Sequence, residues 1–207
     1  MDLPSHGIYA VTDHRLINGR FEMVEQALVG GVKMLQFRNK NKPIEQHKIQ
    51  AKALRRLCRE HRVPFIINDD VNLARRVDAD GIHLGKDDPD IAAARAVLGD
   101  NAIIGVSCYN QLSLAHQAVE AGASYVAFGR FFPSKTKPEA VSCSVEVLHE
   151  ARRVLTCPVV AIGGITPDNG GQIIQAGADF LAVIHGLFGQ ADVLAAAQRY
   201  SRLWGHG

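Results

Sequence analysis

The chain has 207 residues, of which 47% are hydrophobic and 6% aromatic, and its formal net charge at pH 7 is +2. This length supports one sizeable core and is short for two, so we expect a single domain over residues 1–207. The small net charge gives no reason to expect a nucleic acid or a membrane as partner.

Short apolar runs alternate with helical patterns along the whole chain. The predicted strands are Gly7–Val11, Met34–Arg38, the run that starts at Phe65 and stops in Asn68-Asp69-Asp70, Gly81–Gly85, Ile103–Ser107, Tyr125–Gly129, Val159–Gly163 and Phe180–Ile184. The predicted helices cover residues 21–29, 44–61, 71–77, 91–98, 112–121, 145–155, 170–176 and 191–204. Eight strand–helix units without a linker predict an α/β fold, a single (β/α)8 TIM barrel. An open doubly wound sheet is the alternative, but the first strand lacks the glycine pattern of a dinucleotide fold.

The start of the chain and its cysteines bear on its location. Near Met1 there is no cationic start followed by an apolar run, and no apolar stretch is long enough to span a bilayer. The four cysteines (Cys58, Cys108, Cys143 and Cys157) form no Cys-x-x-Cys pair. We therefore expect a cytoplasmic protein with reduced, mostly buried thiols.

Polar residues gather where the predicted strands end, and in a barrel this edge carries function. The strand ends supply Thr12-Asp13, Gln36 with Arg38 and Lys40, Asn68-Asp69, Asp87-Asp88, Ser107, residues 133–137, Gly163-Gly164 and Ile184-His185-Gly186. These residues suggest two anion sites.

The first predicted site combines Asp69 and Asp88 with the cations Arg38, Lys40 and Lys137. Mg²⁺ commonly takes one or two carboxylates together with phosphate oxygens, so this mixture favours a metal-bridged polyphosphate. The alternative is that Asp69 and Asp88 only cap the helices that follow them.

The second predicted site is Gly163-Gly164 with Gly186. Loops after the seventh and eighth strands of such barrels hold phosphate through backbone N–H groups, and glycine allows close approach. A tight turn would explain the glycine pair equally well.

No Ser-His-Asp or Cys-His arrangement can be argued from the order or spacing of residues. His83 lies within a strand, where a hydrogen-bonded core histidine is the preferred interpretation. Ser107 either binds phosphate or caps the next helix. Without an evident nucleophile or base, metal-assisted departure of diphosphate becomes the favoured chemistry.

Several short motifs together resemble the thiamine phosphate synthase family along almost the whole chain. They are Tyr9-Ala10-Val11-Thr12-Asp13, Gln36-Phe37-Arg38-Asn39-Lys40, Ile67-Asn68-Asp69-Asp70, Asp80-Gly81-Ile82-His83-Leu84-Gly85 with Asp88, Gly105-Val106-Ser107, Thr136-Lys137-Pro138 and Ala161-Ile162-Gly163-Gly164-Ile165. The resemblance implies a transferase that joins a hydroxymethylpyrimidine diphosphate to a thiazole phosphate and releases diphosphate by a dissociative route.

The resemblance also implies roles for individual residues. Gln36, Arg38, Lys40, Asn68, Ser107 and Lys137 would bind the pyrimidine diphosphate, and Arg38, Ser107 and Lys137 would take part in catalysis. Asp69 and Asp88 would hold the cofactor Mg²⁺. Ser134, Thr136, Gly164, Ile184 and His185 would contact the thiazole phosphate, while Phe37, Asn39 and Lys135 complete the substrate-binding segments.

Two other functions compete with the synthase. A thiazole tautomerase of the same superfamily would not need Asn68, Asp69, Asp88 and Lys137 together. A phosphate-binding regulator on a barrel scaffold is the more distant alternative. The expected partners are the two small-molecule substrates, and self-association into a homo-oligomer is left open.

Overall fold

The computed structural model describes residues 1–39, 44–133 and 141–205, and the eight strands in these ranges close into a parallel barrel in sequence order. The strands are β1 (Gly7–Val11), β2 (Val32–Phe37), β3 (Phe65–Asn68), β4 (Gly81–Leu84), β5 (Ile103–Tyr109), β6 (Tyr125–Gly129), β7 (Val159–Ile162) and β8 (Phe180–Val183). β8 pairs with β1 and so closes the ring. The predicted barrel is confirmed.

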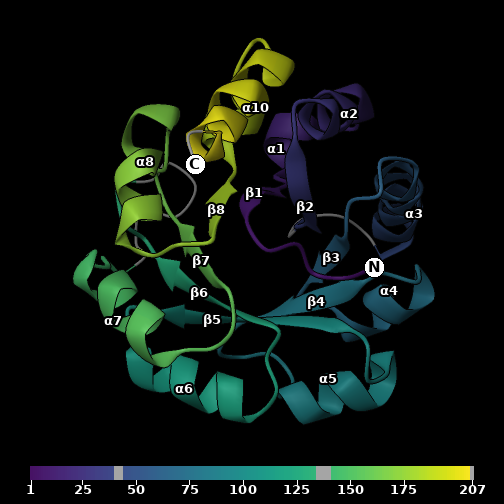
Figure 1. Ribbon diagram of the computed structural model, residues 1–207. Coiled ribbons are helices and arrows are strands. Elements are labelled where there is room, and N and C mark those ends of the chain that lie inside the picture. The colour runs from purple at the N-terminus through teal and green to yellow at the C-terminus, as the bar shows by residue number, and fades with distance from the viewer. Residues whose placement is uncertain (40–43, 134–140, 206–207) are drawn as a thin grey trace.

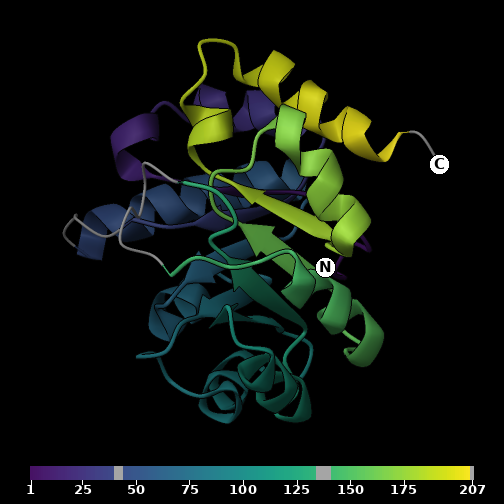
Figure 2. The ribbon, with the colours of Figure 1, turned by 90° about the vertical axis from the view of Figure 1, so that its left-hand side faces the viewer.

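Helices surround the strands in Figure 1 as an outer ring. They are α1 (His14–Ile17), α2 (Phe21–Val29), α3 (Ile44–Glu60), α4 (Val71–Arg76), α5 (Ile91–Leu98), α6 (Leu112–Glu120), α7 (Glu146–Val154), α8 (Pro167–Ala176), α9 (His185–Phe188) and α10 (Val193–Ser201), followed by the 3-10 turn η1 (Arg202–Trp204). Figures 1 and 2 both show α10 beside α2, where the Ser201 hydroxyl donates to the carbonyl of Gly30 at 2.8 Å. The outer ring therefore closes where α2, near the start of the chain, meets α10, near its end.

The alternation of side chains along each strand creates two apolar layers. On β1, Ile8 and Ala10 face the helices, whereas Tyr9 and Val11 face the barrel interior. The interior layer also contains Met34, Ile66 and Phe180, all of which are fully buried. These side chains fill the barrel axis, so that a ligand can enter only above them, at one end.

A buried ion pair lies at the opposite, amino-terminal end of the strands. The Asp80 carboxylate, just before β4, accepts hydrogen bonds from both terminal nitrogens of Arg55 at 2.9 and 3.2 Å. It also accepts from the backbone N–H of Phe65 at 2.8 Å and from the amino terminus at 3.0 Å. Because Asp80 lies far from the carboxyl edge, we assign this cluster to stability.

Two short helices were not predicted from the sequence. α1 and α9 have four residues each, which is too few to produce a helical periodicity. α8 begins at Pro167, three residues before its predicted start, because Thr166 and Asn169 form a capping box there. None of the helices within the described ranges is both long and apolar enough to cross a membrane. All four cysteines are free, with Cys157 half-buried and the others buried, as expected.

Candidate active site

A cavity of about 400 Å³ opens at the carboxyl ends of the strands, and every strand contributes to its wall. The lining residues are Tyr9, Val11, Gln36, Arg38, Asn68, Asp69, His83, Gly85, Lys86, Asp87, Asp88, Ser107, Tyr109, Ala127, Gly129, Arg130, Val160, Ile162, Gly163, Ala182 and Ile184. Its position and mixed polar lining are typical of a small-molecule site in a barrel.

The cavity wall brings Asp69 and Asp88 together, and neither of them caps a helix. The cap of α4 is Asp70, whose carboxylate accepts from the N–H of Leu73 at 2.9 Å. The cap of α5 is Asp90, whose carboxylate accepts from the N–H of Ala93 at 2.7 Å. The capping alternative is therefore wrong for both Asp69 and Asp88.

The backbone holds these two aspartates in defined positions. Asp69 has a left-handed φ of 65° directly after β3, and its N–H donates to the carbonyl of His83 at 3.0 Å. Few non-glycine residues adopt such a φ, and they concentrate at functional sites. Asp88 accepts from the N–H of Gly85 at 2.6 Å, which ties its loop to the end of β4.

The pair of carboxylates does not form a complete metal cage. Across residues 1–39, 44–133 and 141–205, no group of three or more His, Cys, Asp or Glu side chains is arranged to hold a metal ion. The donor set nevertheless fits Mg²⁺, a hard ion that is usually held by one or two carboxylates while substrate phosphates and water complete its shell.

Arg38 is one of two half-buried cations among the described residues that line this cavity; the other is Arg130. The backbone of Arg38 is fixed to β1, since its N–H donates to the Thr12 hydroxyl at 2.8 Å. Burial lowers the pKa of its guanidinium, and the nearby carboxylates of Asp13 and Asp69 oppose that shift. An arginine remains charged under these conditions, so Arg38 presents a fixed positive charge to an anionic ligand.

Asp13 has a structural role although it follows a strand. Its carboxylate caps α1 by accepting from the N–H of Arg15 at 2.9 Å, and it forms an ion pair with the Arg15 guanidinium at 2.8 Å. The Arg15 side chain holds the pKa of this carboxyl below its usual value.

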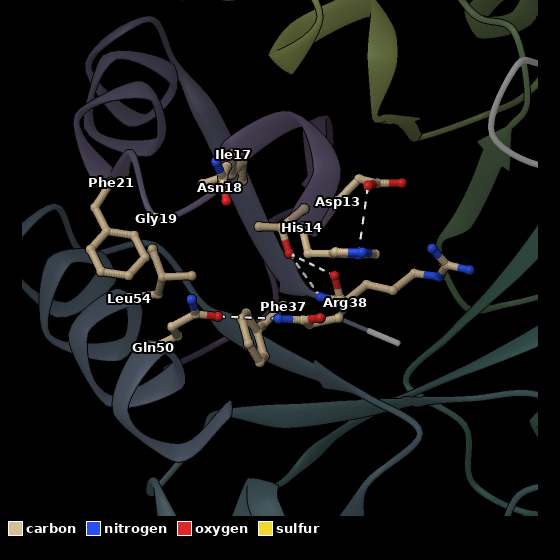
Figure 3. Close-up of a pocket in the computed structure, with 12 residues that line it drawn as sticks. Asp13, His14, Ile17, Asn18, Gly19, Phe21, Phe37, Arg38, Gln50 and Leu54 are labelled. Carbon is tan, nitrogen blue, oxygen red and sulfur yellow. Dashed lines mark hydrogen bonds and ion pairs between the residues drawn. The ribbon is translucent and has the colours of Figure 1, made fainter. Parts of the chain in front are cut away.

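Phe37 and Asn39 lie on another side of β2 from Gln36. The buried Phe37 ring packs against Phe65 and edge-on against His47, between the sheet and α3. Asn39 donates to the side chain of Gln50 at 3.1 Å. Figure 3 shows Arg38 extending away from Phe37 and Gln50, which line a cavity of about 20 Å³, room for about one water.

A chain of hydrogen bonds crosses the barrel beneath the cavity. The Gln36 amide nitrogen donates to the Tyr9 hydroxyl at 2.8 Å, and that hydroxyl lies 2.7 Å from the hydroxyl of Tyr125. The Tyr125 hydroxyl is 3.0 Å from His83 Nδ1, and His83 Nε2 is 2.8 Å from the Ser107 hydroxyl. The chain thus joins residues of five different strands, and its two ends, Gln36 and Ser107, both line the cavity.

The interpretation of Ser107 as a helix cap is wrong. Ser107 lies within β5, and α6 begins after Gln111. The prediction that His83 is a hydrogen-bonded core histidine is confirmed, although the ring also lines the cavity.

The ends of β7 and β8 form the other side of the cavity. Gly163 and Ile184 line it, whereas Gly164 and His185 are half-buried beside it. Gly164 has a φ of 64°, and a Cβ at this position would overlap Phe132 and Pro133, so the loop requires glycine there. Gly186 is explained by packing, because a Cβ would overlap the Tyr200 hydroxyl.

The predicted residues Lys40, Ser134, Lys135, Thr136 and Lys137 lie outside the described residues.

Comparison with known proteins identifies the family. A model of the family described as Thiamine monophosphate synthase matches residues 8–187. The thiamine-phosphate synthase of Methylobacillus flagellatus is 52% identical over 202 residues, covering 97% of this chain and 96% of that protein. The one of Nitrosococcus oceani is 50% identical over 196 residues, covering 94% and 90%. The solved thiamine phosphate pyrophosphorylase from Pyrococcus furiosus has a TM-score of 0.87 at 37% identity, covering 96% of this chain and 95% of its own. The chain belongs to the thiamine monophosphate synthase family.

Membership of the thiamine monophosphate synthase family confirms the predicted family and the prediction that the protein is an enzyme. Several lining residues were not predicted from the sequence, namely Tyr9, Lys86, Tyr109 and Arg130. Tyr9 could have been found from the period of two along β1, which places it on the same face as Val11. Arg130 directly follows β6, a position at which a barrel exposes functional side chains.

Proposed function

We propose that this barrel is a thiamine phosphate synthase. It joins a hydroxymethylpyrimidine diphosphate to a thiazole phosphate and releases diphosphate, acting in the cytoplasm. The observation that carries the proposal is the pair Asp69 and Asp88, which line one cavity with Arg38 while Asp70 and Asp90 cap the helices. Carboxylates that no helix end uses, beside a fixed cation, suit a metal-bound diphosphate better than a neutral ligand.

Mg²⁺ is the cofactor of this proposal, and Asp69 and Asp88 are the residues that hold it. When bound, the ion neutralises charge on the diphosphate and so favours its departure. Beside these two carboxylates, the ion would take its other oxygen ligands from substrate and water, as Mg²⁺ usually does. Arg38, Lys40 and Lys137 bind the remaining diphosphate charge, while Gln36, Asn68 and Ser107 position the pyrimidine.

The reaction needs no nucleophile or base from the protein. The bond between the pyrimidine methylene carbon and the diphosphate oxygen breaks, and both electrons leave with the diphosphate. The nitrogen of the thiazole then donates its lone pair to the methylene carbon and forms the new C–N bond. Arg38 and Lys137 stabilise negative charge that grows on the leaving group in the transition state, which lowers the barrier.

The thiazole phosphate occupies the loops after β7 and β8 in this proposal. Backbone N–H groups at Gly164 and around Ile184 and His185 bind the phosphate, together with the hydroxyls of Ser134 and Thr136. The Gly164 turn supports this role, because its left-handed φ turns the backbone beside the cavity.

A coupling assay with both phosphorylated substrates tests the proposal. Wild-type protein should release thiamine phosphate and diphosphate in equal amounts with Mg²⁺ and almost none in a chelator. Asp88→Asn should lower turnover at limiting Mg²⁺, whereas Asp90→Asn should keep it, since asparagine caps a helix as well as aspartate does. A wild-type protein that releases no diphosphate, or isomerises the thiazole phosphate without Mg²⁺, would refute the synthase.

A further inference from the structure

The hydrogen-bond chain beneath the cavity has a direction that follows from counting its protons. At one end the Gln36 amide N–H donates to the Tyr9 hydroxyl. Burial raises the pKa of both Tyr9 and Tyr125, so each phenol keeps its single proton. Because Tyr9 already accepts from Gln36, it can satisfy its own proton by donating to Tyr125, 2.7 Å away. Within residues 1–39, 44–133 and 141–205, the Tyr9 hydroxyl has no other acceptor for that proton.

The hydrogen bonds from Tyr125 to His83 and from His83 to Ser107 take their direction from the same count of protons. Tyr125 accepts from Tyr9, so its own proton goes to His83 Nδ1 at 3.0 Å. Nδ1 must then be unprotonated, and a neutral imidazole carries its proton on Nε2. That N–H donates to the Ser107 oxygen at 2.8 Å. The Ser107 proton is the one left over at this end of the chain, and Ser107 lines the cavity.

The packing around Tyr125 leaves room for this chain of hydrogen bonds. Gly105 lies opposite His83 on one side and opposite Tyr125 on the other in the sheet register. A Cβ at Gly105 would overlap the phenol ring and hydroxyl of Tyr125. Because Gly105 on β5 has no side chain, Tyr125 can cross from β6 to reach His83 on β4.

We propose that Tyr9, Tyr125 and His83 are positioning residues that fix the Ser107 hydroxyl as a hydrogen-bond donor into the cavity. The site therefore selects a ligand that presents an acceptor atom at Ser107, a diphosphate oxygen or a ring nitrogen rather than an amino group. This inference rests on the proposed function only for the identity of that ligand, the pyrimidine diphosphate. The direction of the hydrogen-bond chain is a property of the protein and does not depend on the ligand.

The protonation state of His83 tests the direction without substrate. Nitrogen-15 NMR of labelled protein near pH 8 distinguishes protonated from bare ring nitrogens, and His83→Gln identifies the signals among the nine histidines. We expect a protonated Nε2 and a bare Nδ1. A proton on Nδ1, alone or together with one on Nε2, would overturn the proposal. If His83→Gln does not fold, backbone-linked assignment of wild-type protein gives the same answer.

Two matched tyrosine variants test the effect on function. Tyr125→Phe removes one link of the hydrogen-bond chain, whereas Tyr200→Phe removes an equally buried hydroxyl that donates to the carbonyl of Ile165 at 2.8 Å; neither Tyr200 nor Ile165 lines the cavity. Tyr125→Phe should lower kcat/KM for the pyrimidine diphosphate by about tenfold and mix the two His83 tautomers, since one orienting hydrogen bond is lost. Tyr200→Phe should change neither.

The outcomes separate this inference from the proposed function. Equal effects of the two tyrosine variants on kcat/KM, or an unchanged His83 tautomer in Tyr125→Phe, would overturn the positioning role. A wild-type protein that makes no thiamine phosphate but shows the expected His83 tautomer would refute the proposed synthase and still support the direction of the hydrogen-bond chain. If Tyr125→Phe does not fold, Tyr9→Phe interrupts the same chain one step earlier and is measured in its place.

Discussion

Asp69 and Asp70 are neighbours in sequence, and the structure predicts opposite results when each is replaced. Asp69 has a φ of 65°, a conformation that costs an L residue about 1–2 kcal/mol, with aspartate toward the low end. Asp69→Gly relieves this strain, while glycine's greater freedom in the unfolded chain offsets about 0.5–1 kcal/mol. The free energy of unfolding should therefore change by less than about 1 kcal/mol. Turnover should fall by about 10²-fold or more, because a ligand of the metal that supports diphosphate departure is gone.

Asp70→Ala is the matched control. This substitution removes the carboxylate that accepts from Leu73 N–H at 2.9 Å, so it should cost about 1 kcal/mol of stability, as loss of a helix cap does. For a chain of 207 residues that corresponds to about 2–4 °C in Tm. Turnover should remain unchanged, since the Asp70 side chain is used at the helix end.

Denaturant unfolding and diphosphate release, measured on the same preparations at limiting Mg²⁺, decide between these roles. Asp69→Ala completes the series, because alanine keeps the strained φ and should be about 1 kcal/mol less stable than the glycine variant. Full turnover in Asp69→Gly would refute the metal assignment. If Asp69→Gly instead lowered the free energy of unfolding by more than about 2 kcal/mol, Asp69 would be a structural residue, because relief of the strained φ alone cannot destabilise the protein.

Three further predictions concern other parts of the barrel. Asp80→Ala removes the carboxylate that accepts from both terminal nitrogens of Arg55, and it leaves a guanidinium only 11% exposed with Asp78 as its remaining partner; it should lower the free energy of unfolding by about 3 kcal/mol in denaturant titrations. Asp13 has a lowered pKa in the folded state, so the stability it contributes is present above the unfolded pKa of 3.8 and disappears as pH falls through the folded pKa. The free energies of unfolding of wild type and Asp13→Asn, measured against pH, should therefore converge in acid, and a difference that persists there would contradict this prediction. Lys137→Ala should lower turnover by about 10²–10³-fold while the KM for the thiazole phosphate stays nearly constant, as steady-state kinetics would show.

The barrel could be predicted because its strands carry a local signal. Each strand is a short apolar run with turn residues on either side, and β1 and β6 begin and end at their predicted residues. α1 and α9 escaped because a four-residue helix depends on its cap and its tertiary contacts rather than on periodicity. The limit of the prediction was therefore element length.

The candidate site was predictable to the level of strand ends, and less so to the level of side-chain direction. The direction of Phe37 is an exception that the sequence does predict, because a period of two along β2 places Gln36 inside the barrel and Phe37 outside it. By contrast, the hydrogen bonds of His83 join residues 42 and 24 positions away in the chain. Such contacts depend on the closed barrel, and no local pattern encodes them.

The aspartates show how one motif separates stability from chemistry. Two acidic residues at a strand end look redundant in sequence, and each alone is explained by capping. After β3 the left-handed residue Asp69 ends the ladder with its N–H on His83 O, and the next residue, Asp70, caps α4. After β4 the cap falls on Asp90, which leaves Asp88 on the cavity wall with its loop tied to Gly85. Since the fold already has its caps, selection for stability alone would not keep aspartate at a strained φ, and the charge facing the cavity is what remains to explain it.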